Sequence, residues 1–213
     1  MKATLTKNPA DVPTEAPAQP GPTGLKHKLE EHFYERRQLM LWGAVDDDSA
    51  HMLVERMLFL NATDSQAPIQ FLLNSPGGST VAGLAVVDAM SMLRAPIHTL
   101  CMGMAASFGA VLLACGTHGQ RRAAPHARIM IHQPWISGRI EGRPVEIIRH
   151  AREIQNTREM LNRILAERTG QSLEKIERDT DRDYWMSAAE ARDYGIIDEI
   201  IEPGTELPPF QPA

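Results

Sequence analysis

The chain has 213 residues, of which 43% are hydrophobic and 23% are charged, a composition typical of one globular domain that can bury a core. The formal net charge is −5 and aromatic residues make up only 5%. A nucleic-acid-binding protein is therefore not expected, because such proteins need basic surface and stacking side chains. Cys101 and Cys115 have no CxxC spacing, so we expect no metal site or disulfide framework, and we expect a cytoplasmic, reducing location.

Proline marks both ends of the predicted domain. Nine of the 15 prolines lie in Met1–Gly24 and Pro203–Ala213. We therefore expect a disordered tail or propeptide at 1–24, a folded domain at 25–202 and a flexible C-terminal tail at 203–213. Residues 95–120 carry no Asp, Glu, Lys or Arg and are long enough to cross a membrane, but their Pro, Gly and His residues favour a strand, a turn and a helix instead.

Strands and helices alternate along the domain. Gln38–Trp42 is predicted as a strand, and Ser49 is predicted to cap a helix. The apolar residues of that helix recur at helical spacing: Ala50, Leu53, Val54, Met57 and Leu58. Ile69–Leu73 is an apolar strand, followed by the turn Asn74–Gly78 and a buried helix that ends at Leu93.

The same alternation continues in the second half of the chain. Ile97–Met102 is predicted as a strand, Gly103–Gly109 as a turn that feeds a helix, and Ser107–Ala114 as that helix. Arg128–His132 is the next strand, and Val145–Arg168 is a long helix with an apolar stripe along one side.

Near the C-terminus, Tyr184–Met186 is predicted as a brief strand. Ser187-Ala188-Ala189-Glu190 is a capping box that opens the last helix. The whole pattern predicts an α/β domain built from strand–helix units.

Two turns carry residues that suit catalysis. The glycines of Ser75-Pro76-Gly77-Gly78 allow a sharp bend that exposes backbone N–H groups, as an oxyanion hole requires, although a plain strand–helix turn is the commoner reason for such a pair of glycines. Ser107 stands between small residues at a helix N-terminus, where it suits a nucleophile or a simple N-cap. His132 at a strand end and Asp183 in a charged loop complete one of many formally possible Ser–His–Asp combinations.

Longer motifs distinguish among these combinations. Asn74–Gly78 (NSPGG), Gly103–Gly116 (GMAASFGAVLLACG), Arg128–Pro134 (RIMIHQP) and Thr169–Asp183 (TGQSLEKIERDTDRD) closely resemble the proteolytic subunits of the Clp protease family, which are ClpP-type serine peptidases. The resemblance runs from about Glu35 to Glu202.

The resemblance implies a role for each matching position. Ser107 matches the nucleophile, His132 the general base and Asp183 the acid that orients the histidine. The backbone N–H groups of Gly78 and Phe108 match the oxyanion hole. Asp181 and Arg182 resemble the pair of residues that contacts the opposite ring, so Asp181 is not the expected catalytic acid. No cofactor and no metal are implied.

The implied fold is the crotonase-like superhelix of strand–helix units with a protruding handle helix, here Val145–Arg168. The implied assembly is two stacked heptameric rings, formed alone or with a paralogous subunit. The implied activity is that of a self-compartmentalised serine endopeptidase that cuts unfolded chains delivered by an AAA+ unfoldase. ATP would be used by that partner, since this chain has no Gly-x-x-x-x-Gly-Lys-Ser/Thr motif.

Other functions fit the sequence less well. A non-catalytic ring subunit of a mixed Clp complex should lack a triad member, and none is lacking here. An acyl-CoA hydratase or isomerase of the same superfold needs no serine–histidine pair. A serine–lysine peptidase needs a lysine in a matching motif, and Lys175, the only lysine after Lys28, lies in none.

Three positions depart from the family pattern. Gln70, Leu72 and Arg122 stand where the family often has aromatic residues that help to form the docking pocket for the unfoldase. The resemblance therefore implies altered contact with that partner.

Overall fold

The computed structural model describes residues 22–134, 142–202 and 204. The chain divides between His32 and Phe33 into two units. Helix α1 spans Pro22–Glu35, and its residues up to His32 are the described part of the first unit. No pattern in the sequence predicts this helix. Most of the expected N-terminal tail and all of the expected C-terminal tail except Gly204 lie outside the described residues.

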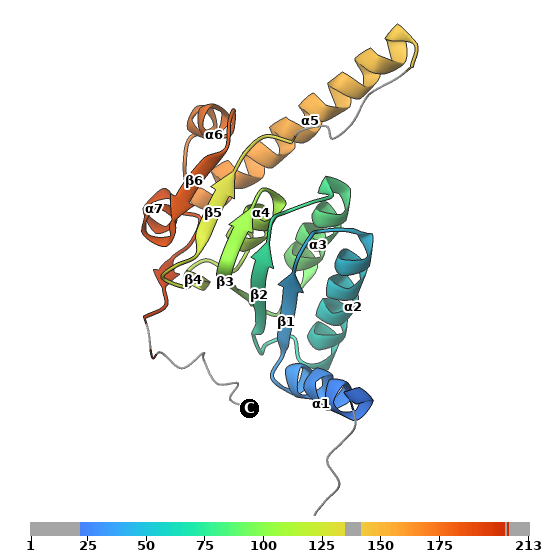
Figure 1. Ribbon diagram of the computed structural model, residues 1–213, viewed down its shortest axis with the longest axis vertical. Coiled ribbons are helices and arrows are strands. Elements are labelled where there is room, and N and C mark those ends of the chain that lie inside the picture. The colour runs from blue at the N-terminus through green and yellow to red at the C-terminus, as the bar shows by residue number, and fades with distance from the viewer. Residues whose placement is uncertain (1–21, 135–141, 203, 205–213) are drawn as a thin grey trace, which may run out of the picture. The chain divides into compact units, whose positions relative to one another are not determined.

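A parallel sheet forms the centre of the second unit (Figure 1). Its main path runs β1-β2-β3-β4-β7, with every neighbouring pair parallel. The end of β3 also pairs with β5 in parallel, and β5 pairs with β6 in antiparallel fashion. The bounds of the strands are β1 Gln38–Trp42, β2 Ile69–Ser75, β3 Ile97–Ala106, β4 Arg121–Ala123, β5 Arg128–Ile131, β6 Tyr184–Ser187 and β7 Glu199–Ile200.

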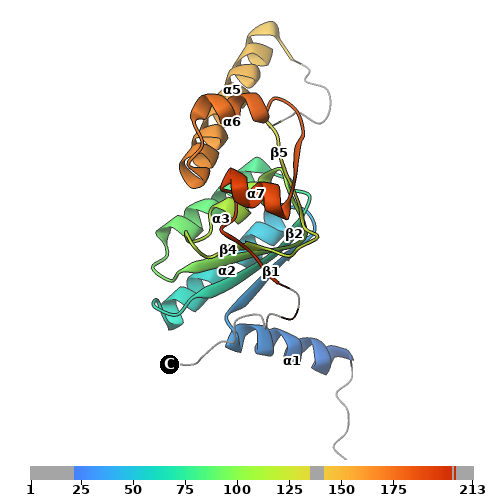
Figure 2. The same ribbon diagram turned by 90° about the vertical axis from the view of Figure 1, so that its left-hand side faces the viewer.

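Helices connect the strands, as the alternating pattern predicts. Their bounds are α2 Asp47–Thr63, α3 Thr80–Met92, α4 Phe108–Ala114, α5 Pro144–Thr169, α6 Leu173–Asp179 and α7 Ala188–Tyr194. All seven residues of α4 are buried. The N-terminal half of α5 extends beyond the sheet, as expected of a handle helix, whereas its C-terminal half is anchored by buried Leu161 and Leu165 and packs against α6 (Figures 1 and 2).

Two details of the predicted elements are wrong. The N-cap of α2 is Asp46, whose carboxylate accepts a hydrogen bond from the N–H of Ser49 at 2.8 Å. Ser49 is the third helical residue, and its hydroxyl oxygen accepts a hydrogen bond from the Asp46 N–H at 2.9 Å. The first four residues of the predicted turn Gly103–Gly109 belong to β3, and Met104–Ala106 continue the sheet by pairing with β5.

The core encloses both cysteines. Cys101 in β3 is fully buried, and burial raises the pKa of its thiol to about 12. Cys115 follows α4 and is 7% exposed, and burial raises the pKa of its thiol to about 11. Neither forms a disulfide. Among the helices that the structure describes, none has the length and apolar character needed to span a bilayer.

Candidate active site

Ser107 stands at the junction of β3 and α4 with a strained backbone. Its φ is 55°, a value that residues other than glycine rarely adopt. Its N–H donates to the carbonyl of Met130 in β5 at 2.8 Å, which ties this junction to the strand that leads into His132. Although Ser107 occupies the N-cap position of α4, its side chain makes no capping hydrogen bond. The simple N-cap interpretation of its hydroxyl is therefore wrong.

A hydrogen-bonded chain links the Ser107 hydroxyl to two other side chains. His132 Nε2 lies 2.8 Å from Ser107 Oγ, and His132 Nδ1 lies 3.0 Å from Asp183 Oδ1. The His132 side chain is 17% exposed and that of Asp183 is 60% exposed. The structure thus brings together the three residues selected by the resemblance, although they come from three separate segments.

The glycine turn after β2 lies directly against Ser107. A Cβ on Gly77 would stand 2.6 Å from the Ser107 Cβ and 2.8 Å from the Phe108 nitrogen. A Cβ on Gly78 would overlap the Val45 carbonyl oxygen. Both glycines have positive φ, so both close approach and backbone conformation require glycine here. The Ser75 hydroxyl supports the turn by accepting a hydrogen bond from the Gly77 N–H at 3.1 Å.

Two backbone N–H groups remain available beside the hydroxyl. Within residues 22–134 and 142–202, no hydrogen-bond acceptor is found for the N–H of Gly78 or of Phe108. Phe108 begins α4, and the first N–H groups of a helix have no partner inside it. Gly83 of α3 leaves room for the Phe108 ring, because a Cβ there would overlap the ring carbons. These N–H groups can bind an oxyanion.

A cleft of about 550 Å³ opens over these groups. It is lined by the 76–80 segment together with Ser107, His132 and Pro134. A smaller cavity of about 20 Å³ adjoins it and reaches toward α5. Its walls are mostly apolar side chains, namely Phe108, Val111, Ile131, Leu161 and Leu165, with Asn162 among them. This cavity places an apolar surface beside Ser107.

Asp181 and Arg182 lie next to the hydrogen-bonded chain but outside it. Both side chains are exposed, at 57% and 92%, and their charged atoms are 3.6 Å apart. Within the described residues, Asp181 makes no hydrogen bond to His132. The structure therefore separates these two residues from the Ser107–His132–Asp183 group, as the resemblance implies.

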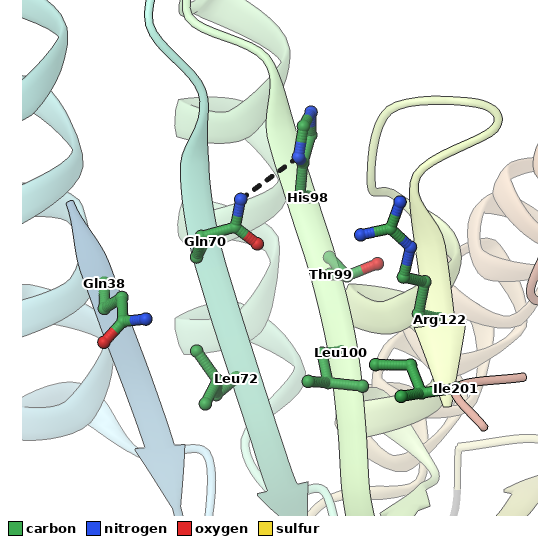
Figure 3. A pocket seen from close by; sticks show the side chains of 8 residues that line it. All are labelled: Gln38, Gln70, Leu72, His98, Thr99, Leu100, Arg122 and Ile201. Atoms are coloured by element: carbon green, nitrogen blue, oxygen red, sulfur yellow. Dashed lines mark hydrogen bonds between the residues drawn. The ribbon is translucent and has the colours of Figure 1, made fainter. Parts of the chain in front are cut away.

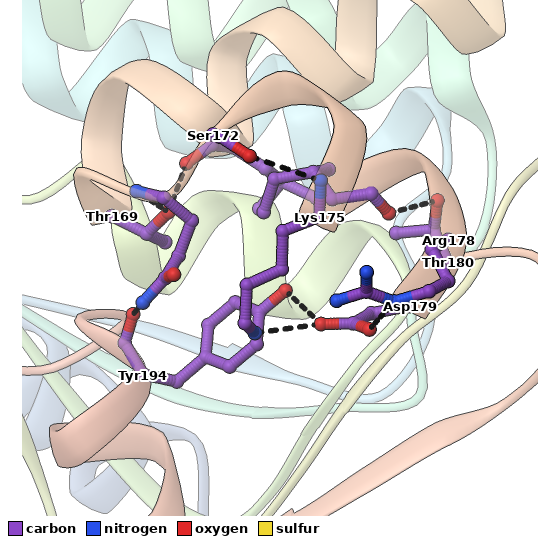
Figure 4. Close-up of polar contacts among 10 residues, drawn as sticks. Thr169, Ser172, Lys175, Arg178, Asp179, Thr180 and Tyr194 are labelled. Atoms are coloured by element: carbon purple, nitrogen blue, oxygen red, sulfur yellow. Dashed lines mark hydrogen bonds and ion pairs between the residues drawn. The ribbon is translucent and has the colours of Figure 1, made fainter.

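A polar cluster supports the helix that precedes Asp183 (Figure 4). The Asp179 carboxylate accepts hydrogen bonds from Lys175 Nζ at 2.7 Å and from the Tyr194 hydroxyl at 3.0 Å. Although burial alone would raise it, the pKa of Asp179 is lowered by these two donors. The pKa of Tyr194 is raised by burial and by the neighbouring Asp179. The cluster fixes α6 to α7 through charge and hydrogen bonding.

The positions expected at the docking pocket also lie together (Figure 3). Gln70, Leu72 and Arg122 line a shallow pocket of about 10 Å³ on the sheet. Gln70 Nε2 lies 3.2 Å from His98 Nδ1, and Arg122 Nε donates to Glu199 at 2.9 Å. The pKa of His98 is lowered by burial and by the nearby Arg122. The lining of this pocket combines polar residues, including Gln70, His98 and Arg122, with the aliphatic side chains of Leu72, Leu100 and Ile201 (Figure 3).

The described part of the chain contains no group of three or more His, Cys, Asp or Glu residues arranged to hold a metal ion.

Comparison with known proteins gives the family. A family model described as Clp protease matches residues 25–204. The chain therefore belongs to the Clp protease family, and this membership supports a role as a peptidase. Its α/β fold is the crotonase-like fold that the motifs lead us to expect. Over 165 residues it is 53% identical to the ATP-dependent Clp protease proteolytic subunit 2 of Prochlorococcus marinus (strain MIT 9313), a match that covers 78% of this chain and 82% of that relative.

Sequence reasoning missed several residues that shape the site. Gly83 looks like an ordinary small residue in an apolar helix, and Thr180 and Asn162 look like polar surface residues. Yet Gly83, Thr180 and Asn162 are all buried. For Gly83 and Asn162 the sequence signal is their position inside segments with a clear apolar period, whereas Thr180 stands in a charged run that gives no such signal.

Proposed function

We propose that this chain is a serine endopeptidase in which Ser107 is the nucleophile, His132 the general base and Asp183 the orienting acid. The observation that carries the proposal is the continuous hydrogen-bonded chain from Ser107 Oγ through both ring nitrogens of His132 to Asp183. A serine needs such a base to become a nucleophile, and the base needs a third group to hold its tautomer.

The mechanism follows from these contacts. The Asp183 carboxylate accepts a hydrogen bond from the N–H at His132 Nδ1, which keeps the proton on Nδ1 and leaves Nε2 able to accept the proton of the Ser107 hydroxyl. The Oγ then attacks the scissile carbonyl, and His132 passes the proton to the leaving amine. Water hydrolyses the acyl-enzyme by the same route in reverse.

The oxyanion is stabilised by the N–H groups of Gly78 and Phe108. These donors are held by the glycine turn and by the start of α4, so they need no rearrangement when charge develops on the carbonyl oxygen. The apolar cavity beside Ser107 receives the side chain on the acyl side of the cut bond, and we expect a preference for apolar residues there.

We further propose that the substrates are unfolded polypeptides and that the chain acts in the cytoplasm in two stacked heptameric rings. The rings form either from this chain alone or with a paralogous subunit, with Asp181 and Arg182 at the contact between rings. The exposed apolar side chains of α2 and α3, including Phe59 and Met92, support self-association. An AAA+ unfoldase of the Clp type would deliver substrates and hydrolyse ATP, in keeping with the name of the 53% identical relative.

Docking of the unfoldase is proposed to be weak for rings of this subunit alone. The polar Gln70 and Arg122 and the aliphatic Leu72 line the pocket where the resemblance leads us to expect aromatic contact area. Buried aromatic anchors are often worth about 2 kcal/mol or more each, so loss of two or three weakens binding by about 10²-fold or more. A better-docking paralogue or a specialised partner would then be needed.

The experiment that tests the peptidase assignment combines labelling with mutation. A fluorophosphonate should label Ser107 in the wild-type protein and leave Ser107→Ala unlabelled, and the variant should lose peptide hydrolysis by several orders of magnitude. Ring assembly of the variant, measured by mass photometry, is the control for folding. Ser107→Ala rings that retain more than about a tenth of the activity, far above the residual rate expected without a nucleophile, would sink the assignment and favour a non-catalytic ring subunit.

A further inference from the structure

Asp183 depends on its backbone for its position. Its side chain is 60% exposed, and among the described residues the hydrogen bond found for its carboxylate is the one to His132. An exposed carboxylate of this kind has rotamer freedom unless the chain around it is fixed. The segment that must be fixed is the turn at residues 180–183, which joins α6 to β6.

The residue after the histidine holds this turn. The Gln133 N–H donates to the Thr180 carbonyl at 2.7 Å, and its side-chain amide donates to the Asp181 carbonyl at 3.1 Å. Two consecutive carbonyls of the turn are thus attached to the neighbour of His132. The distance between base and acid is therefore set through Gln133 as well as through the direct hydrogen bond.

The start of the turn is anchored in the core by a hydroxyl. Thr180 is fully buried, and its Oγ1 lies 2.8 Å from the Ile176 carbonyl and 3.2 Å from Asn162 Oδ1. Asn162 of α5 is itself only 2% exposed. A buried polar group that loses its partner carries a desolvation cost. The buried pair of Thr180 and Asn162 therefore strongly favours one placement of the turn relative to α5.

The same asparagine lies at the substrate cavity. Asn162 lines the small apolar pocket beside Ser107, between Leu161 and Leu165 on the same helix. The turn that carries Asp183 is thus fastened to a residue of the pocket wall. The pocket and the acid of the triad share one point of attachment.

We propose that Thr180, through its buried hydroxyl, whose one proton lies between the Ile176 carbonyl and Asn162 Oδ1, is a positioning residue that holds the Asp183 carboxylate on His132. The proposal rests on the serine-peptidase function proposed above. Thr180 touches neither the substrate nor the reacting atoms, so it acts on kcat through Asp183. Asn162 has a second role in the pocket wall, so its replacement should change KM as well.

The test begins with two substitutions at Thr180 and a fluorogenic peptide. Thr180→Val removes the hydroxyl but keeps the shape, and we expect kcat to fall by about 10- to 100-fold with KM within about 2-fold, because small misplacements of catalytic groups cost up to about 10² in rate. Thr180→Ser restores the hydroxyl and should keep kcat within about 3-fold of wild type. A Thr180→Val protein that folds, assembles and retains wild-type kcat would overturn the proposal.

A second background separates positioning from general damage. In Asp183→Asn the orienting acid is already lost, so adding Thr180→Val should lower the residual rate by less than about 3-fold, since coupled residues are not additive. An equal fold-loss in both backgrounds would show that Thr180 acts on the fold and not through Asp183. Should Thr180→Val fail to assemble, Gln133→Ala is the substitute, and we expect a fall in kcat that again disappears in Asp183→Asn.

Tyr194→Phe provides the matched control. It removes one hydrogen bond from α6, the bond to Asp179, and leaves the contacts of the turn intact. It should lower the thermal midpoint while kcat stays within about 2-fold of wild type, because this hydrogen bond contributes to stability but does not hold the turn that carries Asp183. A drop in kcat as large as that of Thr180→Val would refute a specific role for Thr180. The Ser107→Ala variant distinguishes the two hypotheses: activity without Ser107 rejects the peptidase assignment, whereas Ser107-dependent activity that ignores Thr180 rejects only the positioning role.

Discussion

The two ends of strands β2 and β3 are built in different ways. Toward their N-terminal ends the pairing is regular, with Gln70 opposite His98, and the side chains of the two strands line the shallow pocket. At their C-terminal ends the register shifts, and positive φ angles occur at Gly77, Gly78 and Ser107. The pocket is formed by side chains on a regular sheet. The candidate active site depends in addition on unusual backbone conformations, which place the Ser107 hydroxyl and the nearby N–H groups.

This difference decides how each region can change. Side chains on a regular strand can be exchanged without moving the strand, so the pocket can acquire a new partner through substitutions at Gln70 or Arg122. The active site has no such freedom, because a Cβ on Gly77 or Gly78 would collide with neighbouring atoms of the site or of the chain beside it. Substitutions at the C-terminal ends of β2 and β3 should therefore cause large losses of activity, whereas substitutions at their N-terminal ends can improve the binding of a partner.

The largest expected effect comes from the acid of the triad. Asp183→Asn should lower kcat by about 10⁴-fold, because the amide holds the wrong tautomer of His132. Asp181→Asn should leave kcat of intact double rings within about 3-fold and act mainly on ring stacking, since exposed charge pairs contribute little energy within one chain. Peptide hydrolysis and mass photometry on the same samples measure both outcomes. The reverse result would show that the acid is Asp181.

A substitution at Gly83 tests whether the active site depends on the backbone position of Phe108. Gly83→Ala should lower kcat by about 10- to 100-fold, because the new methyl group pushes the Phe108 ring and moves its N–H, and losing one oxyanion donor costs about 10² to 10³. The control is Asp88→Ala, at an exposed position of the same helix. Unchanged kcat in Gly83→Ala would mean that the Phe108 N–H does not contact the oxyanion.

Aromatic substitutions in the shallow pocket test whether its side chains can be exchanged to change docking of the unfoldase. The double variant Gln70→Tyr, Arg122→Phe should tighten docking to the organism's own Clp unfoldase by about 10- to 100-fold. Degradation of a tagged folded reporter, titrated with unfoldase in the presence of ATP, measures the change. ATP-independent cleavage of short peptides should stay the same. Tight, saturable degradation by wild-type rings alone would reject the weak-docking proposal.

The smallest expected effect is a pH dependence of stability that originates in the pocket. The pKa of His98 is lowered in the folded chain from its ordinary value of 6.5, so the unfolded state binds a proton first as the pH falls. Stability from this group is present above about pH 6.5 and decreases below it. His98→Gln should remove this contribution, and its thermal midpoint should fall less than that of wild type between pH 7 and pH 5.5. Parallel profiles would exclude His98 as the source.

The alternation of apolar segments was enough to predict most of the sheet. β1 is confirmed at both ends, and β2, β3 and β5 are confirmed in place, because short apolar strands between turn residues give a clear signal. β4 is missed because two of its three residues are arginines. Arg121 is nonetheless buried, since it is paired with Asp198, and such a pairing across 77 residues leaves no local pattern in the sequence.

The candidate site was only partly accessible from the residues alone. Local spacing identified Ser107 and the glycine turn as suitable for catalysis, but it left the base and the acid open, because the three segments meet only after folding. The resemblance selected His132 and Asp183, and their geometry agrees with that selection. The buried hydrogen bond between Thr180 and Asn162 has no counterpart in any local rule.

The two cysteines make this chain convenient for labelling. Alkylating reagents react with thiolates, and burial keeps Cys101 and Cys115 protonated at neutral pH. A maleimide dye should therefore leave the native protein unmodified, although no cysteine has been replaced. A cysteine introduced at His118, whose side chain is 68% exposed, would then carry the dye and report on subunit exchange by energy transfer between labelled subunits.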